Sequence, residues 1–164
     1  MTCTLRLMLC LGVLCMACGA DHDHEGHQHA GAHPSSAADA GAGLQGDEYL
    51  AGMEKASTDG HFRIALIEST PIPQDLTLYT WTIEVRDANG QPLDGATVVA
   101  EPTMPDHGHG TFPITTPGVA AEEVGRFTLT DMDLFMAGVW QIELRISAGE
   151  LSDTAFFHFV LDKS

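Results

Sequence analysis

Cysteine is missing from most of this 164-residue chain. All four cysteines (Cys3, Cys10, Cys15 and Cys18) fall within the first 18 residues. Beyond Cys18 the sequence therefore excludes a disulfide framework, a thiolate metal site and a cysteine nucleophile. Any metal chemistry in the rest of the chain depends on other donors, chiefly histidine and methionine.

Basic residues are scarce as well. Seven Lys and Arg stand against 23 Asp and Glu, which gives a formal net charge of −16. Such a chain repels nucleic acid and anionic lipid surfaces, so neither is an expected partner. It attracts cations, although acidity as a means of staying soluble explains the bulk charge equally well.

Long apolar runs are also missing. The apolar stretch from Leu7 to Leu14 is too short to cross a bilayer, which takes about 20 residues. It follows Arg6 and precedes Ala17 and Cys18, an order that resembles a bacterial lipoprotein signal. We expect residues 1–17 to be a removed signal and Cys18 to carry lipid; an ordinary secretory signal cut elsewhere is the alternative. The resemblance implies a lipid-anchored, periplasm-facing protein of the cell envelope, and the Gly after Cys18 favours the outer membrane.

Residues 18–46 form a low-complexity segment rich in Ala, Gly, Ser, Asp and His, which predicts a disordered tether. Its dense imidazoles and carboxylates suit Zn(II), Cu(II) or Ni(II) at low affinity, and the alternative is a solvated spacer. Residues 47–60 are expected to be a linker or a short helix. The histidines of the tether are His22, His24, His27, His29 and His33.

From residue 61 onward the hydrophobic period is two. Apolar residues alternate with polar ones through residues 79–86 and again through 140–146, which predicts half-buried strands. Turn signals such as the Asp-Ala-Asn-Gly of residues 87–90 recur at short spacing. Further strands are expected near 61–67, 95–101, 112–115, 125–130 and 153–161. Residues 61–164 therefore predict an all-β, immunoglobulin-like antiparallel β-sandwich of about seven strands, held by packing alone.

One loop of this predicted sandwich collects metal donors. Residues 102–110 read Pro-Thr-Met-Pro-Asp-His-Gly-His-Gly and place one thioether, Met104, beside two imidazoles, His107 and His109. A thioether is a soft ligand, so its combination with imidazole favours copper, with zinc as the alternative. The competing interpretation of the histidines is that they are exposed turn residues.

Topology predicts which methionines join this loop. If the strands ending at Thr103 and starting at Gly138 are the third and sixth of such a sandwich, they are antiparallel neighbours. Met132 and Met136 would then share an end of the domain with the histidine loop. The alternative is that both methionines fill gaps in the core.

The same residues carry a family resemblance. The loop Met104–Gly110 and the later run Phe135–Trp140 resemble the YtkA-like domain, which is related to FixH-like proteins, over about residues 61–161. The family often has Met where this chain has His107, and Pro where it has Ala137. The resemblance implies a small extracytoplasmic sandwich, often tethered to a membrane and discussed with metal handling or oxidase maturation. His107 in place of Met shifts the expected preference toward Zn(II) or Cu(II).

The remaining residues point away from catalysis. His61 and His158 are expected to be structural or surface imidazoles, and the sequence has no phosphate loop or nucleophile elbow. We therefore expect a metal chaperone or buffer and not an enzyme. One rival is a non-metal interaction module of the envelope that meets a protein partner and assists the assembly of a membrane complex. Another is a pilin- or adhesin-like structural role.

Overall fold

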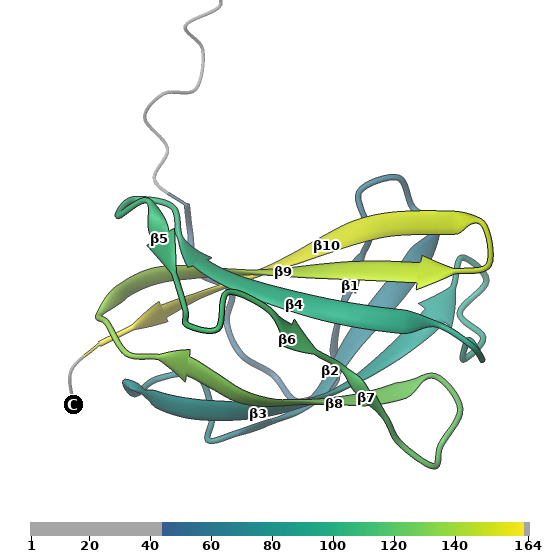
Figure 1. The fold of residues 1–164 in the computed structure, drawn as a ribbon, viewed down its shortest axis with the longest axis horizontal. Coiled ribbons are helices and arrows are strands. Elements are labelled where there is room, and N and C mark those ends of the chain that lie inside the picture. Colours follow the sequence, from purple (N-terminus) through teal and green to yellow (C-terminus); the bar gives the residue numbers. More distant parts are fainter. Residues whose placement is uncertain (1–43, 163–164) are drawn as a thin grey trace, which may run out of the picture. The chain divides into compact units, whose positions relative to one another are not determined.

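The computed structural model describes residues 44–162, and this part of the chain is built from strands and loops without a helix (Figure 1). This described part therefore contains no helix that is long and apolar enough to span a membrane. The strands are β1 Met53–Ala56, β2 Phe62–Thr70, β3 Thr77–Asp87, β4 Thr97–Met104, β5 His109–Gly110, β6 Thr116–Pro117, β7 Val119–Ala120, β8 Arg126–Leu134, β9 Gly138–Ala148 and β10 Leu151–Leu161.

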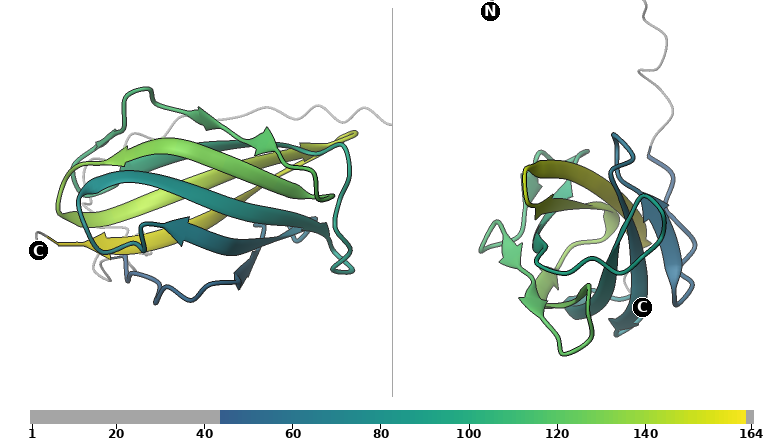
Figure 2. Two further views of the ribbon diagram at one scale, coloured as in Figure 1. Left: turned by 90° about the horizontal axis from the view of Figure 1, so that it is seen from below. Right: turned by 90° about the vertical axis from the view of Figure 1, so that its right-hand side faces the viewer.

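The strands form two antiparallel sheets that face each other (Figure 2). The first sheet has the order β1-β2-β3-β8-β7, and the second has the order β10-β9-β4-β5, with β6 also paired to β4. The segment from β5 to β7 crosses from the edge of the second sheet to the edge of the first. The predicted all-β antiparallel sandwich is therefore confirmed.

The core lies between the sheets because the strands alternate apolar and polar side chains. In β3, Tyr79, Trp81 and Ile83 point inward and are fully buried, and Trp140 and Ile142 of β9 face them from the other sheet. The core cluster runs from Phe62 to Leu161, and every strand pair lies within residues 53–161. Among the described residues, the strand pairs and the buried core cluster therefore lie within residues 53–161, and Tyr49 packs against this core from outside the strands.

Two local expectations were wrong. Within residues 47–60 there is no helix; residues 53–56 form β1, which pairs with β2 from Met53↔Leu66 to Ala56↔Arg63. The physical reason is tertiary: the Tyr49 ring packs edge-on against Phe159 at 6.3 Å and its hydroxyl accepts a hydrogen bond from the Ser69 backbone N–H at 2.9 Å. These contacts hold the chain extended against the first sheet.

The strand expected near residues 112–115 is absent from its predicted place. The segment bends there, and the nearest strands are β5 and β6, on either side of it. Pro113 has no N–H to donate to a ladder, and the Thr111 hydroxyl bonds to the Pro113 carbonyl at 2.9 Å. A pinned loop therefore replaces the expected strand.

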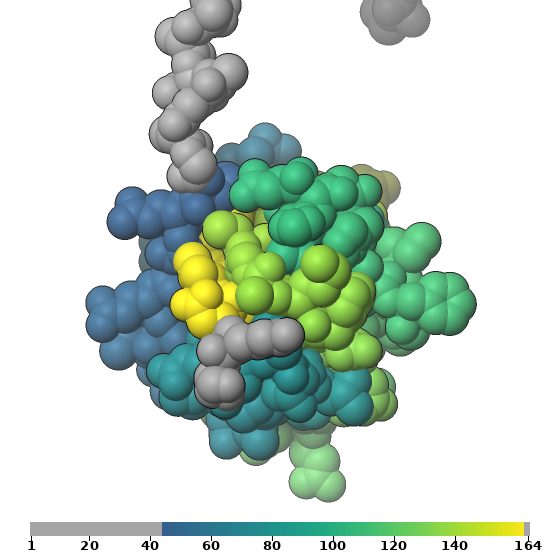
Figure 3. All heavy atoms as spheres, turned by 90° about the vertical axis from the view of Figure 1, so that its left-hand side faces the viewer, coloured from purple at the N-terminus to yellow at the C-terminus, as the bar shows by residue number. Residues whose placement is uncertain are grey.

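The register defines two ends of the sandwich. At one end, which we call the histidine end, β4 finishes at Met104, shortly before His107 and His109. β9 begins at the same end with Gly138, which is paired with Leu161. At the opposite end, which we call the aspartate end for Asp153, β9 finishes at Ala148 and β10 begins at Leu151. Figure 3 views the histidine end face-on.

The two buried tryptophans allow a stability prediction. The Trp140 Nε1–H donates to the Met136 carbonyl at 2.8 Å, whereas the Trp81 Nε1–H has no acceptor within the described residues. Trp140→Phe should therefore lower the free energy of unfolding by about 1 kcal/mol more than Trp81→Phe, because only the former leaves a bonded carbonyl without its donor. Urea unfolding of the two variants checks this. Equal losses would contradict the prediction.

Candidate functional site

The pairing of β4 with β9 brings the two sequence motifs together. These strands are antiparallel neighbours, with Thr103 opposite Gln141, as the sequence predicted. At the start of β9, a Cβ placed on Gly138 would lie 2.9 Å from the Met104 Cε and 3.9 Å from the His107 Nε2. The Met104 Cε and the His107 Nε2 therefore both lie beside the Gly138 backbone.

A tight turn presents the histidines. The Met104 carbonyl accepts hydrogen bonds from the backbone N–H groups of His107 and Gly108, at 3.0 and 2.9 Å. Gly108 adopts a φ of 68°, a left-handed conformation that glycine reaches without steric cost. The chain then returns as β5, with His109 opposite Met104. His107 and His109 are both exposed, with ring centres 5.7 Å apart.

Aromatic contacts orient the His109 ring. Its ring stacks on Phe135 with centres 6.0 Å apart and planes 17° apart. Phe135 in turn meets the edge of the buried Trp140 at 5.9 Å. Because Trp140 is fixed by its bond to the Met136 carbonyl, the core of the sandwich orients one of the two imidazoles.

The three methionines differ in their surroundings. Met104 is fully buried yet lines, with His109 and Ile114, an open hollow of about 370 Å³. Met136 is partly buried and packs against the core. Met132 is fully buried in β8 of the other sheet, where it pairs with Tyr79 and belongs to the core cluster. Its burial favours the gap-filling interpretation.

The residue types of this cluster are those that transition-metal ions prefer. The ring centres of the two imidazoles lie 5.7 Å apart, so both rings reach one ion when their nitrogens turn toward it. Met104 adds a thioether beside His107, on the side of the core. Imidazole and thioether together suit copper, and the imidazoles alone suit zinc.

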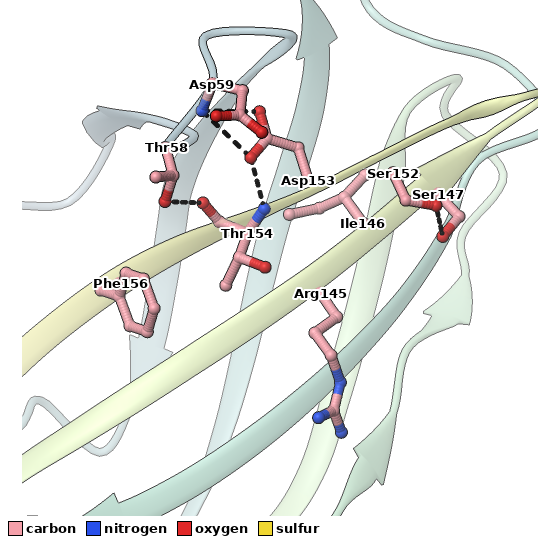
Figure 4. Close-up of a pocket in the computed structure, with 9 residues that line it drawn as sticks. All are labelled: Thr58, Asp59, Arg145, Ile146, Ser147, Ser152, Asp153, Thr154 and Phe156. Carbon is pink, nitrogen blue, oxygen red and sulfur yellow. Dashed lines mark hydrogen bonds between the residues drawn. The ribbon is translucent and has the colours of Figure 1, made fainter. Parts of the chain in front are cut away.

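A second group, which sequence reasoning missed, lies at the aspartate end. Ligand atoms of Asp59, His61 and Asp153 all fall within 4.8 Å of one another. Asp59 and Asp153 of this group line an open hollow of about 600 Å³ (Figure 4). Asp153 is more than 90 residues from the other two along the chain, so no local motif signals the cluster.

The hydrogen bonds of Asp153 argue against a metal at this second group. Its carboxylate, buried to 1% exposure, accepts bonds from the Ser57 hydroxyl at 2.5 Å and from the backbone N–H groups of Asp59, His61 and Thr154. Burial raises the pKa of Asp153, but the hydrogen bonds, that from Ser57 foremost, outweigh it and leave the pKa below its ordinary value. The lone pairs of the Asp153 carboxylate already accept hydrogen bonds that join the β1–β2 turn to β10, which leaves few of them for a metal ion.

His158 also has a structural setting, as expected. Its Nε2 lies 3.1 Å from the Gln141 Oε1 on the outer side of the second sheet. Burial lowers the pKa of His158, the nearby Asp47 opposes this, and Lys55 adds to it. Asp47 also accepts the backbone N–H of His158 at 2.8 Å, so the chain entering the sandwich is fastened to β10.

Several predicted residues lie outside the described part of the chain. They are the signal of residues 1–17, the lipidation site Cys18, and the tether histidines His22, His24, His27, His29 and His33. The functional geometry therefore concerns the sandwich, where His107, His109 and Met104 converge.

Comparison with known proteins identifies a family for this chain. No curated protein and no solved structure matches the chain significantly. A protein family does: the YtkA-like family matches residues 54–145, from β1 into β9, which is more than half of the chain and includes both motifs of the histidine end. This chain belongs to the YtkA-like family.

Proposed function

We propose that this protein binds a transition-metal ion at the histidine end and serves as a metal chaperone or buffer of the cell envelope. Copper is the first choice of metal and zinc the alternative. The observation that supports this is the convergence of His107, His109 and Met104 on one hairpin beside Gly138. Nitrogen and sulfur donors of this kind bind copper ions well and bind Mg²⁺ or Ca²⁺ poorly.

The exposure of the site suits exchange of an ion more than catalysis. Both imidazoles lie at the surface on a turn, while Met104 reaches them from the core. An ion can therefore enter and leave from solvent without disturbing the strands. The histidine end sets no nucleophile beside a base, so we propose a binding role and not an enzyme.

The sequence supplies the proposed location. The signal-like residues 1–17 and Cys18 support a lipid anchor, with the sandwich facing the periplasm and the outer membrane preferred. The five tether histidines would bind metal separately and weakly, as a local reserve. The acidic charge of −16 raises the local concentration of cations around such a protein.

Metal titration of residues 44–164 tests the proposal. Cu(I) under anaerobic conditions, Cu(II) and Zn(II) are each titrated against a competing chelator. We expect one ion to bind with a Kd below about 1 μM. The double variant His107→Ala with His109→Ala should lose at least about a hundredfold in affinity, because it removes both imidazoles.

The matched control replaces the other two histidines of the sandwich. His61→Ala with His158→Ala removes the same number of imidazoles and should leave the affinity unchanged. Met104→Leu keeps the buried volume but removes the sulfur, so it should weaken Cu(I) and spare Zn(II). Binding that survives His107→Ala with His109→Ala, or that needs the tether, would refute the defined site.

A further inference from the structure

Asn89 is the only asparagine in the sequence, and a glycine follows it. In an Asn-Gly pair the backbone nitrogen of the glycine can attack the side-chain amide carbon of the asparagine, because the glycine has no Cβ to obstruct the approach. Asn89 is exposed, in the connection from β3 to β4. This connection lies at the aspartate end, where Thr97 of β4 pairs with Ser147 of β9 (Figure 1). Water therefore reaches an amide that has a nucleophile beside it in the chain.

The turn that carries Asn89 holds this nucleophile in a hydrogen bond. The Gly90 N–H donates to the Asp87 carbonyl at 3.0 Å, and the Asp87 N–H donates to the Gln91 carbonyl at 2.8 Å. Asp87 and Gly90 stand at the first and fourth positions of the turn, where a type I turn favours Asp and Gly. A nitrogen whose N–H is bound in a folded turn is not free to approach the side chain before it, so attack on Asn89 requires the turn to open.

The Asp87 side chain fastens the turn a second time. Its Oδ1 accepts the backbone N–H groups of Asn89 and Gln91, each at 2.9 Å. These hydrogen bonds, that from Gln91 foremost, hold the pKa of Asp87 below its ordinary value, so the carboxylate is ionised and bound at neutral pH. The Asp87 carboxylate therefore limits how often the turn opens.

The neighbouring side chains in this connection are much less reactive. Gln91 is followed by Pro92, whose nitrogen carries no hydrogen and cannot close a neutral imide. The Gly95 N–H does point to the Asp94 Oδ1, at 2.8 Å, but an ionised carboxylate is a far poorer electrophile than an amide. Ring closure in this connection is therefore expected at Asn89.

We propose that Asn89 is a site of spontaneous deamidation, at a rate set by the hold of Asp87 on the turn. The Gly90 nitrogen gives up its proton to hydroxide and bonds to the Asn89 Cγ, and the side-chain nitrogen leaves as ammonia. Water then opens the cyclic imide at either carbonyl, which gives aspartate or isoaspartate at position 89. No oxidant or reductant takes part. Both products add one negative charge beside Asp87, and isoaspartate also adds a carbon to the backbone of the turn.

Incubation of the full chain in water enriched in heavy oxygen, at mildly alkaline pH, tests this. Digestion with trypsin in ordinary water then releases the peptide from Asp87 to Arg126, and mass spectrometry of its fragments locates the label. We expect heavy oxygen at Asn89, with loss of the amide nitrogen, and an unchanged Gln91 in the same peptide. Only deamidation during the incubation carries the label.

Variants of Asp87 test the control of the rate. Asp87→Ala should raise the rate at least about fivefold, because the turn opens more often without the bonds to Asn89 and Gln91. Asp87→Ser retains an acceptor that suits this turn position and should raise the rate less. Asp94→Ala is the matched control, since it removes a carboxylate of the same connection that bonds only to Gly95, and it should leave the rate unchanged.

Three results would overturn the proposal. The first is an unlabelled Asn89 in the folded chain under conditions in which the urea-unfolded chain deamidates. The second is an equal rate in the parent chain and in Asp87→Ala, which would mean that the carboxylate does not set the rate. The third is labelling of Gln91 as fast as that of Asn89, which would indicate direct hydrolysis without ring closure.

Discussion

Asp153→Ala is expected to lower the free energy of unfolding by about 3 kcal/mol. The substitution removes a buried acceptor from the Ser57 hydroxyl and from the backbone N–H groups of Asp59 and His61. Leaving a buried donor unsatisfied costs about 1 to 3 kcal/mol, and water satisfies the more exposed of these donors. Chemical denaturation near neutral pH measures the loss, and Asp59→Ala is the control because it retains the backbone N–H that Asp153 binds.

The pH dependence gives this prediction a second readout. Because hydrogen bonds hold the pKa of Asp153 below its ordinary value, the unfolded chain takes up the proton at a higher pH than the folded one. The stabilisation that ionised Asp153 contributes is thus complete above the ordinary aspartate pKa of about 3.9. It is lost as the pH falls through the lowered pKa of Asp153 in the folded protein. Asp153→Ala should lack this part of the acid destabilisation. An equal loss of stability in Asp59→Ala would show that the bonds to Asp153 are not the cause.

Gly138→Ala is expected to damage both stability and metal binding. Gly138 has a φ of 129°, which is strained for any residue with a Cβ, and the added methyl would come within 2.9 Å of the Met104 Cε. We expect a loss of about 2 kcal/mol in the free energy of unfolding. We also expect at least about tenfold weaker metal binding, since the side chains of Met104 and His107 both lie beside this glycine.

Gly149→Ala is the matched control for this variant. Gly149 also has a positive φ, 59°, but an added Cβ there meets nothing within 4 Å. It should cost about 1 kcal/mol of stability and leave metal affinity unchanged. Urea unfolding and chelator competition on both variants separate backbone strain from damage to the site. Unchanged metal affinity in Gly138→Ala would mean that Met104 and His107 do not act together.

The sequence predicted the arrangement of the histidine end because two of its signals are independent of packing detail. Alternation predicted the strand that is β9, a further strand was expected near residues 95–101, and the connectivity of a seven-stranded sandwich made these two strands neighbours. Met104, His107 and the start of β9 then had to share one end. The stacking of His109 on Phe135 was beyond prediction, because it depends on side-chain positions set by Trp140.

The errors concern short segments, whose conformation is decided by what they touch. Residues 47–56 carry an ambiguous pattern, and the extended form prevails because Tyr49 finds Phe159 and Ser69 across the fold. Asp153 was missed for a related reason. It occupies an inward position of β10, where a charged residue is acceptable only because donors from the distant β1–β2 turn reach it.

By itself, then, the sequence determined the fold class, the limits of chemistry without thiols, and the loop that carries the metal donors. These follow from composition, period and motif, which are local properties of the chain. Only the tertiary structure decided which donors meet, that Met132 belongs to the core, and that Asp153 joins the two sheets at the aspartate end. Those outcomes depend on strand register and burial, which arise when residues far apart in the sequence compete for the same space and the same hydrogen bonds.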